Sequence, residues 1–298
     1  MKVFLTGATG FVGRSVAARL IEDGHDLRCL VRREESDEAA YLRGLGAKLS
    51  TGNILDAVSF VEGARGCEAL IHLVGIIFER RGASFQEVHV HGTVNALEAA
   101  AVAGVGRFVY MSALGTGPEA ASAYHRTKWE AEQAVRVSGI PHTIFRPSTI
   151  FGADSELFKM LFGQVRRLPF VPVIGNGRYR MQPISVQDVA ACFSRCLGNE
   201  AAVDKTYELG GPEALSYNDV IDAICLAMGR KRAKLHAPVA LVKPVAWLSE
   251  HLQGKPFLTT DQLTMLLGDN VCDIAAMRHD LGVEPAGLEE GLKKALEG

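Results

Sequence analysis

The chain has 298 residues, of which 48% are hydrophobic and 22% are charged, and this balance is typical of a folded globular protein rather than a disordered one. Its length fits one large domain or two closely associated ones. The formal net charge of −2 supplies no overall positive field, so we expect no nucleic-acid partner.

The six cysteines are scattered and include no Cys-x-x-Cys pair, which indicates a reducing compartment and predicts no metal site. The first expected strand begins at residue 2, which leaves no room for a targeting signal ahead of the fold. The longest apolar stretch, 238–248, is interrupted by Lys243 and Pro244 and is shorter than the roughly 20 residues that a membrane span needs. We therefore expect a cytoplasmic protein.

Short apolar runs alternate along the chain with longer segments of helical period. The runs expected to form strands are 3–5, 27–31, 70–74, 108–111 and 142–145. The segments expected to form helices between them include 12–22, 93–103 and 127–137. Continuous apolar strands separated by helices are typical of parallel sheets that are buried on both faces. The sequence therefore predicts an α/β fold with a doubly wound parallel sheet of the Rossmann type.

A second lobe is indicated after residue 150, where the chain becomes richer in Phe, Pro and Gly. We expect a helix at 186–197 to return to the first lobe and residues 207–209 to leave it again. The expected division is a dinucleotide-binding domain at 1–150 with 184–206, and a smaller substrate lobe at 151–183 with 207–298. From Ser216 onward the sequence predicts mostly helix.

The segment TGATGFVG (6–13) follows the first expected strand and opens the first expected helix. Glycines in such a turn let the backbone approach a pyrophosphate, and the free N–H groups of the helix end attract its negative charge. The segment therefore predicts a dinucleotide site. Arg32 and Arg33 stand at the end of the second strand, where an acidic residue would favour NAD(H) and an arginine favours the 2′-phosphate of NADP(H). NADP(H) is thus the favoured cofactor, and NAD(H) remains open.

Six further stretches accompany this motif. They are GNILD (52–56), HVHGTVN (89–95), YHRTK (124–128), RPSTIFG (146–152), YRMQPISVQD (179–188) and YELGG (207–211). Together with TGATGFVG they resemble the extended short-chain dehydrogenase/reductase family, that of the NAD-dependent epimerases and dehydratases. The resemblance covers essentially the whole chain.

Three other stretches resemble one branch of that family, which contains the nucleotide-binding accessory subunit of respiratory complex I. They are SALG (112–115), GNGRYRMQP (175–183), and PFLTTDQL (256–263) with the following GDN (268–270). The resemblance to this branch implies an alternative without catalysis, in which a bound nucleotide supports an assembly such as a respiratory complex.

The resemblance also implies roles for individual residues. The residues expected around the cofactor are Thr6, Gly7, Thr9, Gly10, Phe11, Val12, Gly13, Arg32, Arg33, Asn53, Ile54, Leu73, Val74, Gly75, Tyr124, Lys128 and Pro147. Arg178 and Arg180 lie where relatives use an arginine to bind a substrate diphosphate, although two exposed loop arginines would explain them equally well. Asp188 is expected to cap the N-terminus of a helix.

Tyr124 and Lys128 are four residues apart, so both side chains rise from one face of a helix. We expect Tyr124 to exchange a proton with a substrate hydroxyl or keto oxygen, and Lys128 to lower the pKa of the phenol. Active members of the family carry two hydroxyl residues at the preceding strand end, and the second is catalytic. Here Ser112 is followed by Ala113, so the expected catalytic set is Tyr124, Lys128 and Ser112, with Ser122 as a substitute donor.

Two functions stay open on this basis. One is an NADP(H)-dependent oxidoreductase or epimerase-like enzyme that acts on a small substrate, and the other is a non-catalytic nucleotide-binding protein. Residues 238–248 add a question of location, because an apolar helix beside the basic residues 230–234 either rests on an anionic membrane surface or a partner, or is a buried helix of the second lobe.

Overall fold

A computed structural model describes residues 1–80, 82–252 and 256–297. Within these residues, seven parallel strands form the central sheet in the order β11-β6-β5-β4-β1-β2-β3. Their bounds are β1 Lys2–Thr6, β2 Asp26–Val31, β3 Lys48–Thr51, β4 Ala69–His72, β5 Arg107–Met111, β6 His142–Pro147 and β11 Lys205–Leu209. The predicted α/β fold with a doubly wound parallel sheet is confirmed.

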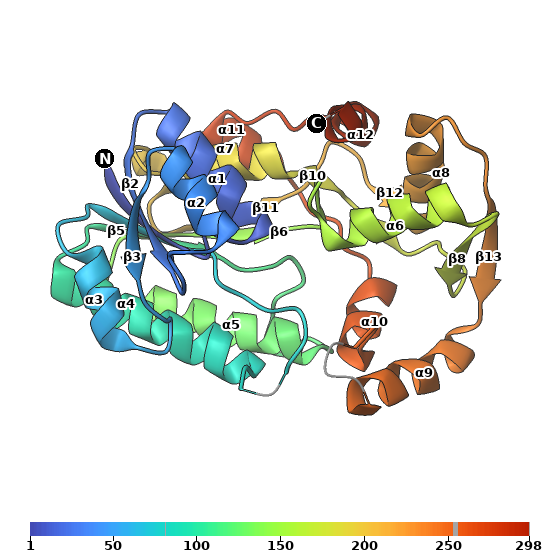
Figure 1. Ribbon diagram of the computed structural model, residues 1–298, viewed down its shortest axis with the longest axis horizontal. Coiled ribbons are helices and arrows are strands. Elements are labelled where there is room, and N and C mark those ends of the chain that lie inside the picture. The colour runs from blue at the N-terminus through green and yellow to red at the C-terminus, as the bar shows by residue number, and fades with distance from the viewer. Residues whose placement is uncertain (81, 253–255, 298) are drawn as a thin grey trace.

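Helices cover both faces of this sheet (Figure 1). On one face lie α1 Phe11–Glu22, α7 Val186–Arg195 and α11 Ala275–Leu281, and on the other α3 Ala57–Ala64, α4 Gly92–Ala103 and α5 Ala123–Val137. Helix α2, Asp37–Gly44, connects β2 to β3, and a π-helical segment, Gln86–His91, leads into α4. The strands are continuous apolar runs because both of their faces are buried; Val3, Phe4 and Leu5 of β1 are fully buried.

The strand β11 corrects one expectation, because residues 207–209 do not leave the first lobe. Tyr207 pairs in register with Phe145 of β6, and the two rings lie 5.9 Å apart. The Tyr207 hydroxyl donates to Asp280 of α11 at 2.8 Å, which ties this late helix to the same edge of the sheet. The chain therefore returns to the first lobe with both β11 and α11.

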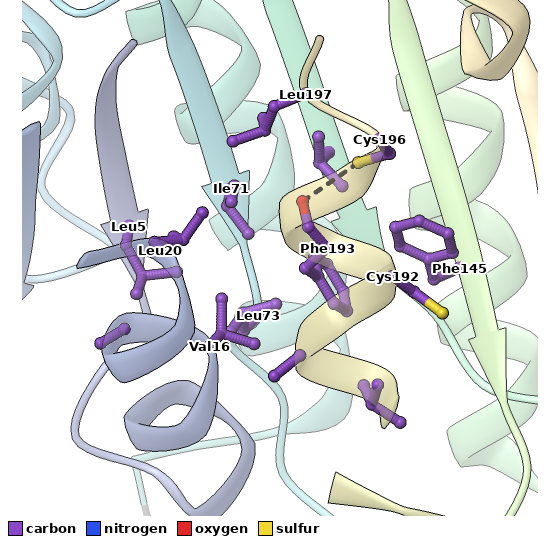
Figure 2. Packing of buried hydrophobic residues seen from close by; sticks show 14 of the residues in the cluster. Leu5, Val16, Leu20, Ile71, Leu73, Phe145, Cys192, Phe193, Cys196 and Leu197 are labelled. Carbon is purple, nitrogen blue, oxygen red and sulfur yellow. Dashed lines mark hydrogen bonds between the residues drawn. The ribbon is translucent and has the colours of Figure 1, made fainter. Parts of the chain in front are cut away.

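Helix α7 provides much of the core on its face of the sheet (Figure 2). Its Phe193 packs edge to face on Phe145, with the ring centroids 4.7 Å apart. Cys192 and Cys196 are buried here as small apolar side chains, and the Cys196 thiol donates to the Phe193 carbonyl at 3.2 Å. The return of 186–197 to the first lobe follows from this packing.

The remaining elements form the second lobe, on the right in Figure 1. Its helices are α6 Glu156–Arg167, α8 Tyr217–Ala227, α9 Val239–Leu252, α10 Thr260–Leu267 and α12 Leu288–Glu297. Its strands form two-stranded sheets, in which β7 Ile150–Phe151 pairs with β10 Ile184–Ser185, β9 Arg180–Met181 with β12 Leu215–Ser216, and β8 Phe170–Ile174 with β13 Ala233–Ala237. None of the helices in the described ranges is long and apolar enough to span a membrane.

Candidate active site

The glycine turn between β1 and α1 has the geometry of a phosphate cradle. Gly7 has a φ of +79°, a conformation that other residues rarely adopt, and a Cβ there would lie 3.2 Å from Leu73 and from Val74 N. A Cβ at Gly13 would lie 2.0 Å from the Gly7 carbonyl oxygen, so α1 packs as closely on the turn after β1 as it does only because Gly13 has no side chain. No side chain caps α1 at Gly10, so its first N–H groups are not taken up by a cap. These residues fit a pyrophosphate.

The remaining residues expected at this end of the cofactor flank the cradle. Thr6 is buried and its hydroxyl lies 2.7 Å from His72 Nδ1, whereas Thr9, Phe11 and Val12 are partly exposed. Leu73 and Pro147 are buried, Val74 is partly exposed, and Gly75 is exposed.

The end of β2 borders an open hollow of about 460 Å³, which is lined by Arg33, Glu34, Glu35, Ser36 and Thr51. Arg32 is exposed beside it, and the Thr51 hydroxyl donates to Glu34. Asn53 and Ile54 follow β3, and Asn95 of the HVHGTVN stretch donates to the Ile54 carbonyl at 2.9 Å. This contact joins the GNILD and HVHGTVN stretches, which are far apart in the sequence.

Lys128 is buried at the carboxyl end of β5. Its Nζ donates to the Met111 carbonyl at 2.9 Å and lies 5.0 Å from the centroid of the Tyr110 ring. Burial lowers the pKa of Lys128 to about 7, although the charge of Glu132 opposes this shift. A Cβ on Gly75 would lie 3.1 Å from the Lys128 Nζ, so the absence of a side chain at Gly75 lets the loop after β4 pack closely on the ammonium group.

Tyr124 lies on the first turn of α5, one turn before Lys128, and its side chain is partly exposed. Its ring contacts three aromatic rings edge to face: His89 at 5.3 Å, His125 at 5.2 Å and Phe85 at 5.9 Å between centroids. Burial raises the pKa of the Tyr124 phenol to about 12, so the expectation that Lys128 lowers this pKa is wrong. The phenol is therefore protonated at neutral pH and suited to donate a proton.

His89 holds the loop after β4 against α5, a role that the sequence analysis did not assign. The Thr127 hydroxyl donates to the carbonyls of Ala123 and Tyr124, so it accepts from His89 Nδ1 at 2.9 Å. His89 Nε2 is then free to accept from Ile76 N–H at 3.1 Å. Burial lowers the pKa of His89 to about 2, in agreement with this neutral form.

The hydroxyl groups near the strand end are all engaged with the protein. Ser112 donates to Thr116 at 3.4 Å, and Thr116 donates to the Ala113 carbonyl at 2.6 Å. Ser122 caps α5 by accepting from His125 N–H, and its hydroxyl lies 2.8 Å from His125 Nδ1. Of the side chains assigned to catalysis from the sequence, Tyr124 is the one that remains available to a substrate oxygen in the described residues.

A second hollow of about 460 Å³ lies beside the start of α5, and the sequence analysis did not predict it. It is lined by Phe78, Glu79, Arg80, Phe85, Ala123, Glu250, His251, Pro256, Thr259, Thr260 and Asp261. Two of its walls come from the loop after β4 and from α9 with α10, which are far apart in sequence. The sequence signal that could have indicated this hollow was the PFLTTDQL stretch, because about half of the lining residues come from it and from the end of α9.

Arg178 and Arg180 do not line this hollow. Arg178 is exposed, and Arg180 makes a salt bridge of 2.8 Å to Asp269. The capping role expected for Asp188 is wrong, because Ser185 caps α7 and the Asp188 carboxylate accepts from Ala286 N–H at 3.1 Å. Asp188 thus fastens the C-terminal segment to α7.

Helix α9 is not the buried helix that one interpretation expected. Its side chains at Leu241, Val245, Trp247 and Leu248 are between 49% and 68% exposed, while Ala246 and Ser249 face the protein. An apolar helix face is therefore left open to the surroundings. In the described ranges no group of three potential metal ligands gathers at this or any other place.

Comparison with known proteins agrees with this geometry. Residues 3–210 match the model of the NAD dependent epimerase/dehydratase family. The chain is 27% identical over 286 residues to the NADH-ubiquinone oxidoreductase 40 kDa subunit of Neurospora crassa, covering 95% of this chain and 75% of that one. It is 32% identical over 274 residues to a 4-hydroxy-2-methyl-3-oxo-4-farnesyl-3,4-dihydroquinoline-1-oxide ketoreductase of Stigmatella aurantiaca, covering 85% and 80%.

Among solved structures, a UDP-glucose 4-epimerase of Thermotoga maritima superposes with a TM-score of 0.78 over 100% of this chain and 98% of that one. At 18% identity this likeness shows the fold alone. The family match spans the cradle, the Tyr124–Lys128 pair and the strand that follows them. The chain therefore belongs to the NAD dependent epimerase/dehydratase family.

Proposed function

We propose that this protein reduces the keto group of a small substrate with NADP(H), and that Tyr124 donates the proton. The observation that carries the proposal is the position of Tyr124 on the first turn of α5, one turn from the buried Lys128. Its chain neighbour Ala123 and its ring contact Phe85 both line the second hollow. The glycine cradle lies at the same edge of the sheet, at the carboxyl ends of the strands where such folds bind ligands.

The reaction requires one proton and one hydride for each ketone reduced to an alcohol. When bound, the reduced dinucleotide supplies the hydride. Tyr124 supplies the proton to the substrate oxygen, and its pKa of about 12 keeps it protonated throughout the neutral range. Lys128, with a pKa of about 7, changes its protonation in the range where the reaction runs, and its ammonium group lies one helical turn from Tyr124 on α5.

The substrate is proposed to carry an apolar chain or ring system next to its keto group. Phe78, Phe85 and Ala123 supply an apolar part of the hollow, whose lining also holds the charged residues Glu79, Arg80, Glu250 and Asp261. The exposed apolar face of α9 adjoins the rim of the hollow at His251. The name of the Stigmatella relative describes a ketoreductase whose substrate bears a farnesyl chain, and this supports the same class.

The preference for NADP(H) over NAD(H) is proposed from Arg32 and Arg33. Both side chains are exposed at the end of β2, where a guanidinium can bind a 2′-phosphate in bidentate fashion. The negative charge of Glu34 beside them would disfavour a 2′-phosphate, but its carboxylate already accepts a hydrogen bond from the Thr51 hydroxyl.

An assay of NADPH oxidation tests the proposed reaction. Ethyl 3-oxoalkanoates with chains of four to twelve carbons serve as substrates, with a UDP-sugar panel as the contrasting class. We expect NADPH-dependent reduction whose KM falls as the chain lengthens, because each buried methylene adds about 0.8 kcal/mol. Absence of turnover with every ketone would refute the proposal, and turnover of the UDP-sugars alone would replace it with epimerase chemistry.

A second candidate is a nucleotide-binding subunit without catalysis, attached at a membrane surface. Two observations favour it: Ala113 stands in the expected serine position, and α9 leaves Leu241, Val245 and Trp247 exposed beside Lys243. Such a face suits an anionic lipid surface, into which tryptophan and leucine insert while lysine contacts the headgroups. Flotation with phosphatidylserine vesicles tests it. Binding that is lost in Trp247→Glu supports this candidate, and no binding by the wild type contradicts it.

A further inference from the structure

Asp261 connects the second lobe directly to Tyr124. Its two carboxylate oxygens accept from consecutive backbone N–H groups of α5, those of Ala123 at 2.7 Å and Tyr124 at 3.1 Å. These are among the N–H groups that a helix leaves without a partner at its N-terminus. The neighbouring N–H of His125 is taken by Ser122, so the first turn of α5 is completed by one local residue and one residue from α10.

The start of α10, where Asp261 lies, is itself held by a carboxylate of α9. The Glu250 carboxylate of α9 accepts from the backbone N–H and the hydroxyl of Thr260, the residue before Asp261. Thr259 and Gln262 complete the start of α10 with a reciprocal capping box. A carboxylate of α9 thus fixes α10, and a carboxylate of α10 fixes α5.

Both of these carboxylate contacts lie in the wall of one hollow. Glu250, Thr260, Asp261 and Ala123 each line the cavity of about 460 Å³ at the start of α5, and Tyr124 is the next residue after Ala123. A ligand that occupies the cavity therefore contacts the groups that hold the Tyr124 backbone. Helix stability alone would not require this arrangement, because Ser122 already provides a local cap.

We propose that Asp261 is a positioning residue for Tyr124, through which the α9–α10 pair sets the place of the phenol relative to a substrate in the adjoining hollow. This inference rests on the proposed ketone reduction. Reactions of this kind depend on placement, since an error of about 1 Å can cost about 100-fold in rate. The Asp261 contact acts on the backbone from which the reacting side chain extends.

The test compares Asp261→Ala and Asp261→Asn with Asp269→Asn in the full chain. Asp269 lies in the same stretch and accepts from the backbone and guanidinium of Arg180, with no contact to α5. With NADPH and ethyl 3-oxodecanoate, we expect kcat to fall about 10- to 100-fold in Asp261→Ala while KM stays within about twofold. Asp261→Asn should fall less, because its amide oxygen still accepts one N–H, and Asp269→Asn should match the wild type.

A second readout needs no turnover. The protein is labelled with 3-fluorotyrosine, and the fluorine resonance of Tyr124 is identified by its loss in Tyr124→Phe. We expect this resonance to move in Asp261→Ala and to stay in place in Asp269→Asn. A resonance that does not move, or a kcat that is unchanged in Asp261→Ala, overturns the positioning role. If the wild type reduces no ketone, the proposed function fails, and the fluorine resonance alone decides whether Asp261 places Tyr124.

Discussion

The Lys128 ammonium donates a hydrogen bond of 2.9 Å to the Met111 carbonyl, in a position where burial brings its pKa from 10.5 to about 7. The Lys128 amine therefore binds its proton more weakly in the folded protein than in the unfolded chain. The energetic penalty of the buried charge is fully present below pH 7 and is absent above about pH 10.5, where the unfolded chain has also lost the proton.

Lys128→Met should consequently change how stability depends on pH. At about 1.36 kcal/mol per pKa unit, the penalty in the wild type is at most about 5 kcal/mol. We expect Lys128→Met to gain stability relative to the wild type at pH 6, and this gain to shrink steadily from pH 7 to pH 10. Urea unfolding at each pH measures the difference, with the exposed Lys243→Met as the control. A difference that is the same at pH 6 and pH 10 would contradict the lowered pKa.

Gly13→Ala should disrupt the cradle, because the new Cβ would lie 2.0 Å from the Gly7 carbonyl oxygen and 2.7 Å from the Ala8 Cα. The helix α1 must then move away from the turn at Gly7 and Ala8. We expect loss of NADPH binding and destabilisation by more than about 1 kcal/mol. Gly163→Ala is the matched control, since Gly163 lies within α6 with no atom within 4 Å of the new Cβ. It should stabilise the protein by about 0.5–1 kcal/mol, and equal effects of the two changes would refute the argument.

The paired arginines predict a cofactor preference that direct binding can measure. We expect the wild type to bind NADPH about 10- to 100-fold more tightly than NADH, in line with about 1.5–3 kcal/mol from charge-assisted hydrogen bonds. The double variant Arg32→Ala/Arg33→Ala should lose this preference through weaker NADPH binding, while Arg126→Ala, whose guanidinium binds the carbonyls of Ala120 and Ala121, should keep it. Equal dissociation constants for the two cofactors in the wild type would exclude the preference.

Ala113→Ser should increase the turnover of an active enzyme. The hydroxyls of Ser112 and Thr116 are engaged with each other and with the Ala113 carbonyl, so the expected position lacks a donor for the substrate oxygen. Removal of such a donor costs about 2.7–4 kcal/mol in other enzymes, and restoring part of it should raise kcat about 10-fold or more. The kcat of both proteins with one ketone is the measurement. An unchanged or lower kcat in Ala113→Ser would mean that the position faces no substrate oxygen.

The sequence was most informative where one short segment determines its own geometry. The glycines of TGATGFVG are required by contacts within the turn itself, between Gly13 and Gly7, so the cradle could be predicted from local pattern. The buried parallel sheet could also be predicted from local pattern, because each strand is a short continuous apolar run.

Contacts between distant segments could not be predicted in this way. Residues 207–209 were assigned to the wrong lobe because nothing local reveals that Tyr207 packs on Phe145. Asp261 was part of a noted motif, yet its partners lie 137 and 138 residues away, at Tyr124 and Ala123. The apolar pattern of α9 also reads equally well as a buried helix, and its exposure follows only from how the second lobe is assembled.

The proposed reaction depends on the Tyr124 proton, and Tyr124→Phe removes that proton while keeping the ring that packs against His89 and Phe85. The decisive measurement is the rate of NADPH-dependent reduction of ethyl 3-oxodecanoate by this variant, with the NADPH dissociation constant measured on the same preparation and Tyr217→Phe as the control. We predict that kcat falls about 100- to 10,000-fold in Tyr124→Phe while NADPH binding changes less than about threefold, and that Tyr217→Phe retains its activity. A Tyr124→Phe protein that reduces the ketone as fast as the wild type would contradict the account.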